Sequence, residues 1–136
     1  MNKKGFTLVE LMISMFIFAI VMLGLIAGTT LVKKISLRNT LRNAAVNIAS
    51  EEANRIRGMS FDSVSDVCSG SCDPASGNPD CIVERRFRNF NKNFGRSIGV
   101  DPGSNPDIKK VSIEICWDAY DKNYSYTIET IIKDVD

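Results

Sequence analysis

Residues 6–32 read FTLVELMISMFIFAIVMLGLIAGTTLV, and this stretch decides the fold. Apart from small hydroxyl residues it contains one polar side chain, that of Glu10, which is also its only charge. About 20 apolar residues are enough to span a bilayer as a helix. A cleaved secretory signal would have an apolar core of only about 7 to 15 residues, ended by a small-residue cleavage site. We therefore expect residues 6–32 to form a helix that stays in a membrane.

Basic residues flank the apolar stretch on both sides. Lys3 and Lys4 precede it, and four more basic residues follow it: Lys33, Lys34, Arg38 and Arg42. The positive-inside rule therefore gives no orientation by count. Because the preceding flank is only a few residues long and every cysteine lies beyond the stretch, we expect a single pass with the N-terminus in the cytoplasm.

The helical pattern continues beyond the apolar stretch, through residues 33–57. No proline occurs before Pro74, and Gly58 is a natural helix stop. Glu51 and Arg55 are spaced for an i,i+4 ion pair. Apolar residues recur at helical spacing and predict an amphipathic helix: Leu37, Leu41, Ala44, Ala45, Ile48 and Ile56.

The remainder, residues 58–136, has the composition of a β-rich head domain. Ser, Asp, Gly, Pro and Cys dominate residues 59–80, which predicts a loop. The segment Cys81–Phe90 favours a strand, and the prolines and glycines of Gly95–Asp107 predict a second loop.

The last quarter of the chain predicts an antiparallel hairpin. Apolar and polar residues alternate over Val111–Trp117 and again over Tyr124–Ile132, with the turn sequence AYDKN between them. The same alternation places Trp117 in the core rather than on a binding surface. We expect an α+β fold in which one long N-terminal helix, half transmembrane and half amphipathic, packs on a small antiparallel sheet.

All four cysteines lie beyond the apolar stretch: Cys68, Cys72, Cys81 and Cys116. An even number of cysteines in the exported part of a chain is typical of disulfides. Two bonds allow three pairings, and the sequence does not choose among them. A zinc site is the weaker alternative, because no second close cysteine pair accompanies Cys68 and Cys72.

The composition argues against several functions. The chain contains no histidine, which removes the commonest general base and metal ligand. Its net charge is +1, so it is not an electrostatic nucleic-acid binder, and we read Arg85, Arg86 and Arg88 as a solvated strand face. No spacing groups a carboxylate with a nucleophile, so we expect no catalytic residue, no metal and no cofactor.

The N-terminal sequence MNKKGFTLVELMIS contains a short basic leader, a glycine, a phenylalanine and then the apolar helix with its glutamate. It resembles the class III signal of type IV prepilins and type II secretion pseudopilins. The resemblance implies that prepilin peptidase, a membrane aspartyl peptidase, cuts after Gly5 and methylates the new amine of Phe6. It implies a leader at residues 1–5, a pilin fold, and a role for Glu10 in filament assembly.

Physical chemistry supports a function for Glu10. A carboxylate one turn into an apolar span is costly and needs a partner, although a glutamate near a helix end can also reach the headgroups. In the family that the N-terminal sequence resembles, the glutamate at this position pairs with the N-terminal ammonium group. For this chain, the resemblance implies the ammonium group of Phe6 in the same or a neighbouring subunit. Such a pair would set the register of the helices more than it would add net stability.

The final hairpin is similar to the closing strands of minor pilins of the PilV type, through the Trp117 strand and the strand Thr127–Ile132. The resemblance implies a non-enzymatic subunit near the pilus tip that helps to initiate assembly. Its partners would be other pilin subunits, prepilin peptidase, the inner-membrane assembly platform and the lipid bilayer. The head would be periplasmic before assembly into an extracellular pilus or a periplasmic pseudopilus. The alternatives are a type II secretion pseudopilin and a tip module that binds DNA, cargo or surfaces.

Overall fold

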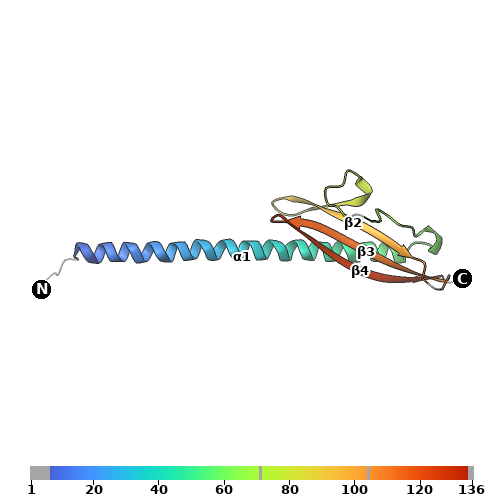
Figure 1. The fold of residues 1–136 in the computed structure, drawn as a ribbon, viewed down its shortest axis with the longest axis horizontal. Helices are drawn as coiled ribbons and strands as arrows, with labels where there is room; N and C mark the ends of the chain where they lie inside the picture. Colours follow the sequence, from blue (N-terminus) through green and yellow to red (C-terminus); the bar gives the residue numbers. More distant parts are fainter. Residues whose placement is uncertain (1–6, 71, 104, 135–136) are drawn as a thin grey trace. The chain divides into compact units, whose positions relative to one another are not determined.

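A computed structural model describes residues 7–70, 72–103 and 105–134. It contains one long helix and four strands, with two short 3-10 helices between them (Figure 1). The chain forms two compact units, Met1–Arg38 and Asn39–Asp136. The expected α+β class is confirmed. In chain order the elements are α1 (Leu8–Arg57), η1 (Phe61–Ser63), η2 (Pro79–Cys81), β1 (Ile82–Arg86), β2 (Asn91–Asp101), β3 (Ile108–Ala119) and β4 (Lys122–Lys133).

The first unit contains the apolar part of α1, whose large side chains are exposed. This helix is long and apolar enough to cross a membrane. Its hydroxyl groups are satisfied within the helix, which lowers their penalty in hydrocarbon. Three of them donate to the carbonyl oxygen three residues earlier: Ser14 to Leu11, Thr29 to Ile26 and Thr30 to Ala27.

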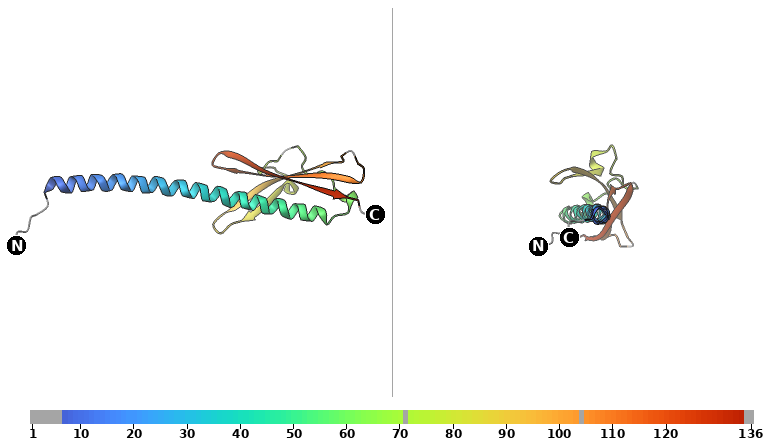
Figure 2. Two further views of the ribbon diagram at one scale, coloured as in Figure 1. Left: turned by 90° about the horizontal axis from the view of Figure 1, so that it is seen from below. Right: turned by 90° about the vertical axis from the view of Figure 1, so that its left-hand side faces the viewer.

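In the second unit, the last part of α1 buries one face against the sheet (Figure 2). Alanines alternate with larger side chains on this face, so the sheet can approach the helix closely. The sheet contributes Phe94, Ile98 and Ile113, all at most 2% exposed. The buried helix residues are Leu41, Ala45, Ile48, Ala49, Ala53 and Ile56.

The four strands form an antiparallel sheet in the order β1-β2-β3-β4. The expected hairpin is present as β3 and β4, which pair from Ile108↔Lys133 to Ala119↔Lys122. Tyr120 and Asp121 make its turn, both with positive φ (51° and 58°). Trp117 is 5% exposed and stacks on Tyr124, so the core interpretation of this tryptophan is confirmed.

Two predictions about the middle of the chain were wrong. The strand expected at Cys81–Phe90 ends at Arg86, because Phe87 to Phe90 form a turn closed by a backbone hydrogen bond of 2.8 Å. The loop expected at Gly95–Asp107 is in large part strand, since β2 runs to Asp101. Gly95 and Gly99 lie within β2, and only Gly103 lies beyond it, with a positive φ of 64°.

The expected ion pair between Glu51 and Arg55 was also wrong. Arg55 bonds to Glu52 instead, at 2.7 Å. Glu51 pairs with Arg85 on β1, and Glu52 also pairs with Arg96 on β2 at 2.7 Å. Both glutamates therefore connect the helix to the sheet. The i,i+4 spacing rule cannot predict this role, because it considers only pairs within one helix.

Candidate functional site at the start of the helix

The predicted cleavage site, Gly5 and Phe6, lies outside the described residues. The described chain begins at Thr7, immediately before the first helical residue, Leu8. Thr7 therefore occupies the N-cap position and Glu10 the third helical position. This spacing permits a capping box, in which two side chains satisfy free backbone N–H groups reciprocally.

The capping box is formed. The backbone N–H of Thr7 donates to Oε2 of Glu10 at 3.0 Å, and the Thr7 hydroxyl donates to the same oxygen at 2.9 Å. The backbone N–H of Glu10 donates in return to Oγ1 of Thr7 at 3.3 Å. The carboxylate is thereby held beside the N-terminal end of α1, where the helix dipole favours negative charge.

The second carboxylate oxygen of Glu10, Oε1, accepts no hydrogen bond from any residue between Thr7 and Asp134 that the structure describes. An ionised carboxylate has capacity for about four hydrogen bonds. Glu10 therefore caps its own helix with Oε2, and among the described residues no group bonds to Oε1.

Thr7 was not among the residues singled out from the sequence. The signal was present, because threonine followed three residues later by glutamate before an apolar run is the capping-box pattern. The cap also restrains the rotamer of the Glu10 side chain.

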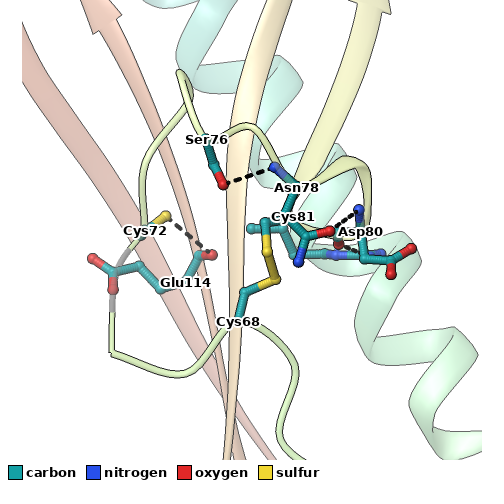
Figure 3. The surroundings of a disulfide bond; sticks show 8 residues. Cys68, Cys72, Ser76, Asn78, Asp80, Cys81 and Glu114 are labelled. Carbon is teal, nitrogen blue, oxygen red and sulfur yellow. Dashed lines mark hydrogen bonds between the residues drawn. A yellow bond between two sulfur atoms is a disulfide. The ribbon is translucent and has the colours of Figure 1, made fainter.

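The four predicted disulfide cysteines lie in the second unit and form two bonds, Cys68–Cys81 and Cys72–Cys116. The first closes the loop between η1 and β1 (Figure 3). The second fastens that loop to β3, where the Cys72 sulfur also lies 3.7 Å from the carbonyl oxygen of Glu114. With all four sulfur atoms bonded in pairs, none is left to hold zinc.

A surface hollow lies beside the Cys72–Cys116 bond. Asp73, Asp118 and Asn123 give it a polar lining, and Trp117 contributes to its wall. Because Trp117 is only 5% exposed, it does not offer a ring face for stacking a ligand. Asp118 is occupied by Lys92, whose Nζ donates to Oδ1 at 2.7 Å. Asp73 accepts a hydrogen bond from the backbone N–H of Ala75 at 2.9 Å, so both described carboxylates of the hollow have partners within the chain.

The Lys92–Asp118 pair predicts a pH dependence. The hydrogen bond from Lys92 holds the pKa of Asp118 below its usual value. A lowered folded-state pKa contributes stability above the unfolded pKa of about 3.9 and loses it as the pH falls through the folded value. We expect Lys92→Met to raise the pKa of Asp118 toward 3.9 (roughly, for a free aspartate), as measured by carboxyl NMR titration of the full chain in micelles. An unchanged pKa would contradict this assignment.

Comparison with known proteins identifies one feature of the chain. Residues 1–26 match the family model of the prokaryotic N-terminal methylation motif. The match covers Gly5, Phe6, the Thr7–Glu10 cap and most of the apolar stretch. No curated protein and no solved structure matches the chain.

Proposed function

We propose that the chain is the precursor of a type IV pilin-like filament subunit. The observation that carries this proposal is the methylation motif at residues 1–26, which coincides with an apolar, capped helix. In this proposal prepilin peptidase cleaves after Gly5 and methylates the new N-terminus at Phe6. Residues 6–32 then anchor the subunit in the inner membrane and afterwards pack in the filament, while residues 33–57 and 58–136 form the helix continuation and head.

Glu10 is the proposed assembly residue. Cleavage creates an ammonium group at Phe6, four residues before a carboxylate that retains one free oxygen among the described contacts. The Phe6 ammonium of a neighbouring subunit is the cation proposed for that oxygen. A helix inserted out of register would leave both charges unpaired in apolar surroundings, so the pair selects the correct register.

We place the subunit among the minor pilins, at or near the pilus tip, with other pilin subunits and the inner-membrane assembly platform as partners. The support is the β3–β4 hairpin, in which the Trp117 strand pairs with the threonine-containing strand that ends the head. The two disulfides support a head on the oxidising, periplasmic side of the membrane. A non-enzymatic role fits a chain without histidine whose thiols are all bonded.

The test is mass spectrometry of the mature N-terminus from cells that contain the peptidase. We expect the chain to begin at Phe6 and to carry one N-terminal methyl group. Gly5→Leu should leave most of the chain uncleaved, because glycine lacks a Cβ and lets the backbone enter the peptidase site closely. Asn2→Ala, a change in the same leader, is the matched control and should be processed normally. A mature chain that still begins at Met1 would sink the proposal.

A further inference from the structure

The turn between β1 and β2 carries a partly exposed aromatic pair. Phe87 and Phe90 stack with their ring centroids 4.8 Å apart and an interplanar angle of 20°. The backbone N–H of Phe87 donates to the carbonyl oxygen of Phe90, which fixes the turn that holds both rings. Phe90 is 40% exposed, so the pair is not part of the core.

Two unpaired cations flank these rings. The side chains of Arg86 and Arg88 are exposed and make no ion pair or hydrogen bond with any residue that the structure describes. Arg85, the neighbour of Arg86, differs because it turns to the helix and pairs with Glu51. Residues 86–90, which we call the basic aromatic turn, therefore present apolar surface and free positive charge side by side.

The sheet register locates this turn within the second unit. Arg86 pairs with Asn91 and Ala119 with Lys122, so the basic aromatic turn and the β3–β4 turn lie at the same end of the sheet (Figure 2). The opposite end is marked by Thr130, whose Oγ1 accepts from Arg57 near the end of α1.

The lengths of β3 and α1 indicate which part of α1 lies on the same side of the unit as the basic aromatic turn. From Val111, the partner of Thr130, to Ala119 the strand rises about 27 Å. From Arg57 back to Asn39 the helix rises about 27 Å as well. Because Thr130 is held at Arg57, the basic aromatic turn lies toward the Asn39 side of this unit, and the neighbouring Arg85 reaches the helix at Glu51.

In the proposed anchored subunit, the length of the connecting chain limits how far this end can lie from the bilayer. The apolar stretch ends at Val32, and the few residues from Val32 to Asn39 reach at most about 25 Å even when fully extended. Aromatic rings and basic side chains are the groups that favour the headgroup region, and basic residues are attracted to anionic lipids. Both the composition of the turn and its short connection to the apolar stretch thus favour a bilayer surface as its binding partner.

We propose that the basic aromatic turn docks on the surface of an anionic bilayer while the subunit is anchored and not yet assembled. The proposal rests on the membrane anchoring in the proposed function and goes beyond it. Single-stranded nucleic acid is the competing ligand, since it also binds rings and cations. The structure favours lipid, because the two rings stack on each other and so offer less free ring surface to bases.

The experiment uses the full chain in nanodiscs that contain brominated lipids, with either neutral or partly anionic headgroups. Phe90→Trp places a fluorescent reporter in the turn, and the native Trp117 gives the background. Ile131→Trp is the matched control, because Ile131 is 67% exposed and pairs with Lys110 toward the opposite end of the sheet. We expect lipid quenching of the Phe90→Trp reporter in anionic discs and background quenching for Ile131→Trp.

Removing the two free charges is the second arm. In the Phe90→Trp chain, Arg86→Gln together with Arg88→Gln should reduce the docking equilibrium constant by roughly 30-fold, from the attraction of two basic residues to an anionic surface. Quenching that is equal at both reporter positions, or unaffected by these changes, overturns the docking proposal. So does binding of labelled single-stranded DNA that depends on both arginines while lipid quenching is absent.

Membrane anchoring is measured separately from docking of the turn. Co-elution of the chain with the nanodisc reports the membrane helix, whatever the turn does. Co-elution without quenching overturns docking alone, and loss of co-elution overturns docking and anchoring together.

Discussion

Replacing Glu10 with alanine is expected to leave cleavage after Gly5 intact and to reduce incorporation into filaments by about 100-fold or more. Without the carboxylate, the Phe6 ammonium of a neighbouring subunit would be buried unpaired. Breaking a buried ion pair by removing one partner costs about 3–5 kcal/mol. Each 1.4 kcal/mol changes an association constant by roughly tenfold, which gives the expected loss.

The structure shows that this substitution alone is ambiguous. Glu10 also caps its own helix through Thr7, so alanine removes a cap as well as a charge. Losing an N-cap interaction costs about 0.5–2 kcal/mol and could impair the subunit without any role in assembly. Two further variants separate the contributions of cap and charge.

Glu10→Gln is the sharper test, because glutamine also serves in a capping box but carries no charge. We expect Glu10→Gln to be as defective as Glu10→Ala. Thr7→Ala removes the hydroxyl contacts and keeps the carboxylate, so we expect it to be incorporated almost normally. The measurement is the ratio of variant to wild-type subunits in purified filaments from cells that express both, by quantitative mass spectrometry. Normal incorporation of Glu10→Gln together with a defect in Thr7→Ala would assign Glu10 to capping.

Glu10 could be singled out as a candidate assembly residue from the sequence, but the geometry of its side chain could not be predicted. The resemblance to prepilin signals implies the cleavage and assembly roles of Gly5, Phe6 and Glu10, and the cost of a lone carboxylate in an apolar helix supports a function for Glu10. The cap by Thr7 was readable from spacing and was missed. The proposed partner of Oε1 is the Phe6 ammonium of a neighbouring subunit, so one folded chain does not contain the pair.

The fold could be predicted wherever the spacing of apolar residues determines which face of a helix or strand is buried. The helix face from Leu41 to Ile56 and the strand Val111–Trp117 each follow from the spacing of apolar residues. Contacts between distant segments leave no such local pattern. The ion pair of Glu51 with Arg85 and the choice of disulfide partners both depend on how the sheet meets the helix and loop.

Gly95 is the clearest case in which the sequence signal was misread. Glycine near proline predicts a loop, yet Gly95 is a buried residue of β2 that pairs with Cys116 on β3. A Cβ at this position would lie 2.6 Å from the Cys116 sulfur and 2.7 Å from the carbonyl carbon of Asp73. The glycine is therefore needed because the disulfide-bound loop crosses directly over the strand.

This arrangement predicts that Gly95→Ala destabilises the head by about 2–3 kcal/mol, in the range for overpacking a rigid site. Gly99→Ala, on the same strand, is the matched control. Its Cβ would meet only the Ser112 hydroxyl at 3.0 Å, a group that can rotate away. We expect a change within about 1 kcal/mol there. Urea unfolding of the full chain in micelles, followed by the fluorescence of Trp117, measures both effects.

Removing the disulfide tests the cause. Cys72→Ala with Cys116→Ala should by itself cost about 2–5 kcal/mol. In that background the loop at Asp73 can move and the Cys116 sulfur is gone, so Gly95→Ala should cost at least about 1 kcal/mol less than in the wild type. Equal costs in both backgrounds would show that crowding by the tethered loop is not the reason for glycine. A reduced cost would show that the Cys72–Cys116 bond, which fixes the loop over the sheet, is what makes glycine necessary at this position.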